Sequence, residues 1–405
     1  MLGSTWHSRS TRGVVVACAS AALVLAGCSG KDTGDAVDLS IQPVMQVDQD
    51  GKEIPFAEGT LAASPAGDGG ANCPPGTTIA MAGALTGKNS ALGINIVNGA
   101  KLAIEQHNEA NSGCQIVLRT WDTEGDEQKA TQVIPQIVGD ESVVGMVGPF
   151  FSGETEATGK ILSDAGLVTM TPSATKVELT QKGWTSFFRG LPHDKVQGGA
   201  VANYMINTAG YEKVCVVKLD DAYGEGLAQA INEGLGGVAD PGCAASVKND
   251  DNKDYSAVVT KVTSAKPDAV FFAGFYAQSA PLIEQLKSGG FEGDFVSGDG
   301  SNDPEFVKQA GTSAEGATLS CPCGPAPAEF ASAYQELTGQ APGIYSVEAY
   351  DLATILAKGI GAGKLTRPDL LDFVRAYDGA GLGRNYSWDA SGELSDALIW
   401  VYEVE

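Results

Sequence analysis

The sequence predicts an α/β protein made of two doubly wound lobes, each built around a parallel sheet. After an N-terminal leader and a polar segment, about 330 residues remain, more than one hydrophobic core usually supports. Within them, short and continuously apolar runs alternate with longer amphipathic runs, the pattern of parallel strands covered by helices on both faces. The alternation runs through once and then restarts, so we expect two such lobes.

The N-terminus has the pattern of a secretory signal that ends at a lipid-modified cysteine. Basic side chains precede the apolar run Val14 to Leu25, which is too short to cross a bilayer as a helix. The run ends in Leu25-Ala26-Gly27-Cys28, which resembles the bacterial lipobox; the alternative is an ordinary signal peptide with a chance cysteine. We expect residues 1–27 to be removed and a lipidated Cys28 to hold the protein, outside the cytoplasm, to a bacterial membrane that it does not span.

Residues 28–71 are predicted to form the lipid anchor and a flexible tether. They are rich in Gly, Ala, Ser and Asp and contain few large apolar residues, a composition that does not support a packed core. The stretch from Val37 to Phe56 is more apolar, and pairing of this stretch with the body of the protein stays open.

The body begins with a first series of strands and helices. Its expected strands are Thr78–Leu85, Gln115–Trp121, Val143–Gly148 and Leu167–Thr171, and its expected helices are Ile94–Asn108, Glu127–Val138 and Gly153–Asp164. The second series has expected strands Lys213–Lys218, Ala244–Lys248, Ala269–Ala273 and Asp294–Ser297, with helices Val196–Thr208, Gly224–Leu235, Tyr255–Ser264 and Ser279–Ser288. The last third is predicted to hold three helices and then a strand pair near Tyr386–Trp388 and Leu398–Tyr402.

The charge balance excludes nucleic acid as a partner. The formal net charge is -24, and no basic run follows the leader, whereas phosphate binding needs clustered Lys and Arg. Such an acidic surface favours solubility.

Six cysteines remain after Cys18 and Cys28 are set aside, an even number in an exported chain. Cys73 and Cys114 each precede one of the first two strands, so they can bond if these strands are parallel neighbours, and Cys215 and Cys243 stand in the same relation later. For Cys321 and Cys323 three alternatives stay open: a bridge across one residue, two free thiols, or half a metal site. Because only His107 and His193 remain as histidines and no CxxC occurs, we expect no metal site and no cofactor.

Ligands of doubly wound sheets bind beyond the carboxyl ends of the strands. Phe150, Phe151 and Ser152 follow one such strand. Ser152 can act as a helix cap or, together with the free amides of a helix N-terminus, hold a carboxylate. The phenylalanines can form the wall of an apolar pocket.

Two further loops carry polar candidates. Ser173 and Thr175 follow the next strand, where Thr175 with Glu178 fits a capping box or, with Ser173, offers oxygens to an ammonium group. Asp299 follows a strand of the second series, either as part of an Asp-Gly turn or as the counter-charge of a ligand amine.

Aromatic residues complete the candidate site. Tyr223 and Phe275 lie beside glycines at two strand ends, and Tyr350 lies on a late helix where it can also simply pack. Hydroxyls and helix amides for a carboxylate, an acid for an amine, and aromatics around them would suit a zwitterion.

The order of motifs from Thr78 onward resembles type 1 periplasmic binding proteins of the leucine/isoleucine/valine-binding group. The motifs that carry the likeness are Ala84-Leu85-Thr86-Gly87, Asn98-Gly99-Ala100, Val147-Gly148-Pro149 with Ser152, Met170-Thr171-Pro172-Ser173-Ala174-Thr175, Asp194 with Gln197-Gly198, Tyr223-Gly224-Glu225-Gly226 and Ala349-Tyr350-Asp351. The resemblance implies a monomeric binding protein that closes two lobes on a small molecule and delivers it to the permease of an ABC transporter.

The resemblance also assigns roles to residues. It implies that Ser152, Ser173 and Thr175 hold the ligand from the first lobe, and that Asp299, Tyr223 and Phe275 contact it from the second. Three positions depart from the family pattern: Leu92 replaces an aromatic residue, Phe275 a tyrosine and Asp299 a glutamate. These changes put the preferred side chain of the ligand in doubt, although a branched-chain or other neutral amino acid is the first expectation.

The resemblance implies three crossings between lobes, near Gly190–His193, Leu319–Cys323 and Gly381–Asn385. The first lobe would then comprise residues 72–192 and 322–382, and the second residues 193–321 and 383–405. Cys321 and Cys323 would lie at one crossing.

Three functional classes compete for this architecture. The preferred class is a transport binding protein. The alternatives are a sensing module for a membrane receptor, or a binding protein whose ligand is an amide or urea. A hydrolase is not expected, because Ser152 lacks a G-x-S-x-G elbow and its general base would have to be His107 or His193.

Overall fold

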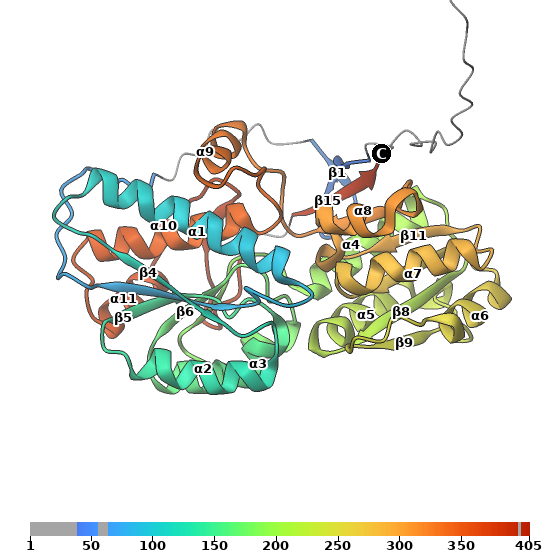
Figure 1. Cartoon of the computed structure of the whole chain (residues 1–405), viewed down its shortest axis with the longest axis horizontal. Helices are drawn as coiled ribbons and strands as arrows, with labels where there is room; N and C mark the ends of the chain where they lie inside the picture. The colour runs from blue at the N-terminus through green and yellow to red at the C-terminus, as the bar shows by residue number, and fades with distance from the viewer. Residues whose placement is uncertain (1–38, 56–63, 396–397) are drawn as a thin grey trace, which may run out of the picture. The chain divides into compact units, whose positions relative to one another are not determined.

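The computed structural model of the chain describes residues 39–55, 64–395 and 398–405. Within these ranges two mainly parallel sheets, each with helices on both faces, confirm the predicted fold class (Figure 1). The predicted signal and Cys28 lie outside the described residues. None of the helices in these ranges combines the length and the apolar character needed to cross a membrane.

The sheet of the first lobe has five parallel strands in the order β4-β3-β5-β6-β7. Its strands are β3 (Thr78–Gly83), β4 (Val117–Asp122), β5 (Val143–Val147), β6 (Val168–Thr171) and β7 (Phe187–Arg189). The inner strands β3 and β5 are buried along their whole length, which explains why their sequences are continuously apolar instead of alternating.

Helices cover both faces of this sheet. The helices of the first lobe are α1 (Ser90–Ala110), α2 (Glu127–Gly139), α3 (Ser152–Asp164), η1 (Val177–Gln181), α9 (Ala328–Thr338), α10 (Ser346–Gly361) and α11 (Arg367–Arg375). Figure 1 shows α1 and α10 on one face and α2 and α3 on the other. A two-stranded sheet of β13 (Asp378–Ala380) and β14 (Asn385–Ser387) completes the lobe.

The sheet of the second lobe has eight strands in the order β2-β1-β15-β12-β11-β10-β8-β9. They are β1 (Ile41–Val47), β2 (Glu53–Ile54), β8 (Val214–Asp220), β9 (Ala245–Lys248), β10 (Ala269–Ala273), β11 (Asp294–Ser297), β12 (Thr318–Cys321) and β15 (Ile399–Val404). The run from β9 to β12 is parallel, and β15, β1 and β2 add antiparallel strands at the other end.

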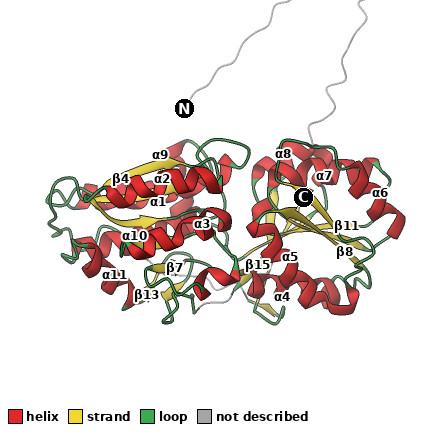
Figure 2. Ribbon diagram, turned by 90° about the horizontal axis from the view of Figure 1, so that it is seen from below, coloured by secondary structure: helices red, strands yellow, loops and turns green. Residues whose placement is uncertain are grey.

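Helices also lie on both faces of the second sheet. They are α4 (Asp194–Asn203), η2 (Tyr204–Thr208), α5 (Ala222–Leu235), η3 (Gly236–Val238), α6 (Ser256–Ala265), α7 (Tyr276–Ser288), η4 (Asp299–Ser301), α8 (Pro304–Ala310) and η5 (Gly311–Ala314). Figure 2 shows α4 and α5 below the sheet and α6, α7 and α8 above it.

All three expected disulfides form. Cys73 bonds Cys114, and Cys215 bonds Cys243, because in each case the two strands are parallel neighbours that start side by side. Cys321 bonds Cys323 across a single residue, which decides among the alternatives left open by the sequence. One disulfide therefore links two neighbouring strands in each lobe, and the third closes a short loop at the end of β12.

The tether prediction is wrong for part of residues 28–71. β1 pairs with β15 along its length and β2 pairs with β1, so this stretch belongs to the second sheet. A tight turn makes the hairpin: Gly51 has a φ of +72°, and the Asp48 carboxylate accepts hydrogen bonds from two backbone amides of the turn. The physical reason for the docking is that β15 would otherwise be an uncovered edge strand.

Replacing Val47 with alanine should lower the free energy of unfolding by about 1–3 kcal/mol, because Val47 is fully buried where β1 meets the sheet. The matched control is Val44→Ala on the same strand, where the side chain is 40% exposed and the expected change is below about 0.5 kcal/mol. Urea unfolding of both variants measures the difference. Equal values would mean that β1 does not contribute to the stability of the lobe.

The third crossing lies later in the chain than predicted. Strands form near both predicted positions, residues 386–388 and 398–402, but their predicted pairing with each other is wrong. β14 pairs with β13 instead, and the indole of Trp388 donates to the carbonyl of Arg189 on β7. The chain stays with the first lobe as far as Ser395, whose amide donates to Ser387, and β15 enters the second sheet at Ile399. Residues 383–395 therefore belong to the first lobe.

Candidate functional site

The candidate site is built from loops at the carboxyl ends of strands in both lobes. The loops after β5 and β6 come from the first lobe, and those after β8, β10 and β11 come from the second. Side chains from the two sets touch: the rings of Phe151 and Phe275 lie 4.8 Å apart, centroid to centroid. The topology therefore brings most of the predicted residues into one place, as doubly wound sheets do.

Asp299 is the buried centre of this cluster. Its carboxylate accepts a hydrogen bond from the Tyr223 hydroxyl at 2.8 Å and another from the Tyr345 hydroxyl at 2.6 Å. Tyr223 belongs to the second lobe, like Asp299, whereas Tyr345 precedes α10 in the first lobe. The carboxylate thus links the two lobes through two phenols. Burial raises the pKa of Asp299, although both hydrogen bonds counteract the rise.

Hydroxyl groups of the first lobe lie at the start of α3 and in the next loop. Ser152 is the first residue of α3, and its hydroxyl accepts a hydrogen bond from the Lys176 amide at 3.2 Å. The Ser173 hydroxyl donates to the carbonyl of Phe150 at 2.6 Å. These bonds join the two loops and place both hydroxyls beside a helix N-terminus, whose free amides and dipole favour an anion.

Thr175 lies beside a second buried carboxylate, that of Asp194. Burial raises the pKa of Asp194 to about 7, the Thr175 hydroxyl lowers it, and the charge of Asp299 raises it further. The charge of the buried Asp299 carboxylate therefore disfavours the charged form of Asp194. A positively charged ligand group between them would lower both pKa values, which is the behaviour expected of an ammonium site.

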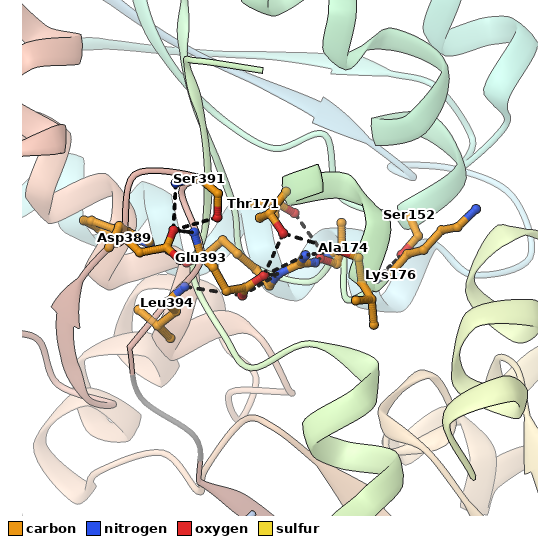
Figure 3. A network of polar contacts seen from close by, with 12 residues as sticks. Ser152, Thr171, Ala174, Lys176, Asp389, Ser391, Glu393 and Leu394 are labelled. Atoms are coloured by element: carbon orange, nitrogen blue, oxygen red, sulfur yellow. Dashed lines mark hydrogen bonds and ion pairs between the residues drawn. The ribbon is translucent and has the colours of Figure 1, made fainter. Parts of the chain in front are cut away.

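A buried arginine fixes the loop that carries Ser173 and Thr175. The Arg189 guanidinium donates to the carbonyl of Ala174 at 2.6 Å and to the carboxylate of Glu393 at 2.9 Å. The Thr171 hydroxyl in turn accepts from the Ala174 amide at 3.0 Å. Figure 3 shows this network running from the Glu393 loop through Ala174 to Lys176 and Ser152. The loop is therefore held at both its carbonyl and its amide groups.

The buried carboxylate of Glu154 fixes the backbone at the start of α3. It accepts from the Phe151 amide at 3.1 Å and from the Thr123 hydroxyl. Burial raises the pKa of Glu154 to about 8, while both hydrogen bonds lower it. The carboxyl is therefore largely protonated in the folded protein near neutral pH.

The stability of the protein should fall as pH rises from 5 to 8, and Glu154→Gln should remove part of that fall. A carboxyl whose folded pKa is raised binds its proton more tightly in the folded state, so its contribution is present at low pH and lost as pH approaches about 8. For Glu154 the loss is on the order of 3 kcal/mol. Urea unfolding at both pH values measures it; equal slopes in the two proteins would contradict the raised pKa. Glutamine can still accept the hydrogen bond from Phe151.

Three aromatic rings form one wall of a cavity of 230 Å³, and one of them, Tyr223, also contacts Asp299 of the polar cluster. Phe275 stacks at an angle on Tyr223 with ring centroids 4.9 Å apart, and it meets Phe151 from the other lobe. Phe151 and Phe275 occupy the N-cap positions of α3 and α7. The residues that line the cavity come from both lobes, so it opens at their junction.

Comparison with known proteins decides the family. A family model described as periplasmic binding protein matches residues 76–405. The chain belongs to the periplasmic binding protein family. Its relatives include proteins of the leucine/isoleucine/valine-binding group, which confirms the resemblance drawn from the motifs.

Individual relatives of this periplasmic binding protein cover most of it. The leucine-, isoleucine-, valine-, threonine-, and alanine-binding protein of Pseudomonas aeruginosa is 29% identical over 335 residues, 80% of this chain and 89% of that protein. The leucine-specific-binding protein of Salmonella typhimurium is 26% identical over 336 residues, covering 80% and 90%. The branched-chain amino acid transporter substrate binding protein of Streptococcus pneumoniae, solved with isoleucine, superposes with a TM-score of 0.74 at 26% identity, covering 81% of this chain and 99% of that one.

The binding protein brings together seven of the nine predicted site residues: Phe151, Ser152, Ser173, Thr175, Tyr223, Phe275 and Asp299. Leu92 is fully buried in the first turn of α1. Its neighbour Ala91 donates its amide to the Tyr276 hydroxyl at 3.3 Å, so this turn reaches the second lobe. Whether these residues bind a ligand stays a prediction.

The structure places Tyr350 away from the cluster. Its hydroxyl donates to Gln106 at 2.6 Å, and its ring meets Phe330 edge-on, so the packing alternative is right for this residue. Tyr345 supplies the aromatic contact instead, in the left-handed conformation with a φ of +66°. Asp194 is the second residue of the cluster that was not predicted from the sequence to bind the ligand; its signal was the motif Asp194 with Gln197-Gly198, directly after the first crossing.

Proposed function

We propose that the protein is an extracytoplasmic solute-binding protein that captures an amino acid between its lobes and hands it to an ABC transporter permease. The observation that carries the proposal is the buried Asp299 carboxylate, which is held by phenols of both lobes. It lies in one cluster with Ser152 at the N-terminus of α3. A carboxylate for the ligand ammonium and a helix N-terminus for the ligand carboxylate are the two groups that a zwitterion needs.

The relatives support the ligand class and the transport role. The names of these relatives give leucine, isoleucine, valine, threonine and alanine as ligands, and one relative is a transporter substrate binding protein. Closure on the ligand would shift an equilibrium between open and closed lobes, and the permease would bind the closed form.

The other functions considered from the sequence differ from this proposal in what they require of the site. An amide or urea ligand would need no counter-charge at Asp299, and a sensor would bind the same ligands but couple to a receptor. We propose no catalysis: the family is one of solute-binding proteins, the Ser152 hydroxyl is bonded to the Lys176 amide, and the His107 ring is bonded to the carbonyl of Pro65.

Isothermal titration of residues 39–405 tests the proposal. The range keeps β1 and β2, and the protein is produced under oxidising conditions and freed of bound ligand by unfolding and refolding. Titrants are the neutral α-amino acids, their amides and urea. Binding of α-amino acids with no response to their amides supports the zwitterion site. Binding of amides or urea alone would replace the ligand class, and silence with all of them would contradict the proposal.

Anchoring by Cys28 is a separate proposal that rests on the sequence Leu25-Ala26-Gly27-Cys28. The full-length protein should partition into detergent and incorporate a labelled fatty acid, because two or more acyl chains hold a protein stably to a membrane. Cys28→Ser should abolish both. Labelling that persists in Cys28→Ser would contradict the assignment.

A further inference from the structure

The cavity of 230 Å³ beside the aromatic wall is lined by more acidic side chains than basic ones. Five carboxylates face it from both lobes: Glu124, Asp126, Glu127, Asp220 and Asp221. One lysine, Lys88, lines it as well. Because such a cleft lies between low-dielectric walls, its field favours a cation far more than an open acidic surface does.

Two of these carboxylates, Asp126 and Asp221, are held in place by backbone amides. Asp126 accepts from the Lys129 amide at 2.8 Å as the N-cap of α2. Asp221 accepts from the Gly224 amide at 2.8 Å as the N-cap of α5, and from the side-chain amide of Asn249 at 3.1 Å. Their charges therefore cannot move away from the cavity as free surface side chains do.

The positive charges nearby do not balance this group. Lys129 pairs with Glu124, and the charge of Lys88 lowers the pKa of Asp221. Burial is nevertheless the stronger influence and raises the pKa of Asp221 to about 6, with the charge of Glu127 adding to the rise.

Glu127 lies against the first turn of α3. A Cβ atom placed on Gly153 would come within 2.3 Å of its carboxylate oxygen, so the close approach depends on a glycine at this position. Glu127 thus brings its charge from α2 to the wall formed by Phe151, next to the predicted ligand groups.

A buried side chain in the same cavity points independently to a ligand with donor groups. Asn89 lines the cavity, is only 6% exposed, and its side-chain oxygen has no hydrogen-bond donor among the described residues. A buried acceptor without a donor is costly unless a bound group satisfies it. An ammonium or guanidinium group donates hydrogen bonds and carries the charge that the carboxylates require.

The aromatic wall fits the same kind of group. Phe151, Tyr223 and Phe275 present rings to the cavity, and a cation is attracted to the face of an aromatic ring. Tyr223 also donates to Asp299, so a single residue contacts both the amine site and the cavity.

We propose that the ligand is an α-amino acid with a positively charged side chain, whose terminal cation occupies this acidic cavity. This inference rests on the proposed function, because the polar cluster around Asp299 would hold the α-amino and α-carboxyl groups. The cavity then selects among amino acids by the charge at the end of the side chain and disfavours anionic side chains.

The test compares ligands that differ only in that charge. Residues 39–405 are titrated with L-lysine and L-norleucine, and with L-arginine and L-citrulline. The charged member of each pair should bind at least about tenfold more tightly at low salt, and the ratio should shrink as salt is raised, because the cavity opens to solvent. L-Glutamate should bind more weakly than L-norleucine.

The double variant Asp221→Asn, Glu127→Gln should reduce the lysine-to-norleucine ratio to about one. Asp164→Asn, an exposed change at the far end of α3, is the matched control and should keep the wild-type ratio. Thermal unfolding verifies that all variants are folded. If norleucine binds as tightly as lysine to the wild type, the inference is overturned and the proposed function stands. If no α-amino acid binds, both are overturned.

Discussion

Replacing Asp299 with asparagine should weaken the binding of an amino-acid ligand at least about 100-fold while the protein remains folded. Asparagine keeps the size of the side chain and one oxygen that can accept from Tyr223 or Tyr345, but it removes the charge. A buried charge-assisted hydrogen bond to an ammonium group is much stronger than the neutral bond that would replace it. Titration calorimetry measures the affinity, and thermal unfolding verifies the fold.

The control for this prediction is Tyr350→Phe. The hydroxyl of Tyr350 is bonded to Gln106, away from the cluster, so its removal should leave the affinity unchanged within about twofold. Ser152→Ala should give an intermediate loss of about tenfold, because the α3 amides remain available to the ligand carboxylate. If Asp299→Asn binds as the wild type does, the ammonium site is elsewhere, and Asp194 becomes the next carboxylate to replace.

The fold could be predicted from the sequence because its strands are short, buried and parallel. Runs such as Ile79–Gly83 and Ala269–Ala273 are apolar throughout, as expected of strands that are covered on both faces of a sheet. Two neighbouring parallel strands begin at the same edge of the sheet. Cys73 and Cys114 each precede one such strand, so their positions in the sequence predicted the disulfide between them. The same argument placed the site residues, since the carboxyl ends of the strands also lie together.

What could not be predicted depended on contacts between segments far apart in the sequence. Tyr345 and Tyr350 lie near the same helix start, and no local pattern shows which ring reaches Asp299; the left-handed conformation of Tyr345 decides it. β1 was included in the predicted tether because of the composition of residues 28–71 as a whole, although the pairing of Val37 to Phe56 was left open; pairing with β15 places β1 in the second sheet. The Asp-Gly pair before β2 was a turn signal for this hairpin that composition alone obscured.

Replacing Arg189 with methionine should lower the free energy of unfolding by about 3–5 kcal/mol. The Arg189 side chain is fully buried and bonds Glu393 and the carbonyl of Ala174. Its loss leaves the Ala174 carbonyl without this donor and the Glu393 carboxylate without its positive partner. Among the described residues, only the Thr180 hydroxyl and the Leu394 amide then still donate to Glu393. Arg189→Lys should cost less, because it keeps the charge but cannot make both bonds at once. Urea unfolding at constant pH measures each change.

A double substitution distinguishes the effect of the buried ion pair on stability from the effect of Arg189 on the position of the loop that carries Ser173 and Thr175. Arg189→Met with Glu393→Met removes both charges, so most of the lost stability should return, because two apolar side chains can replace a buried ion pair at little cost. Ligand affinity should stay about tenfold lower in the double variant, since the Ala174 carbonyl still lacks the bond that fixes Ser173 and Thr175. Recovery of both stability and affinity would show that Arg189 serves only the fold. Recovery of stability alone would show that this buried arginine, which contacts no ligand in the proposed site, also positions the hydroxyls that do.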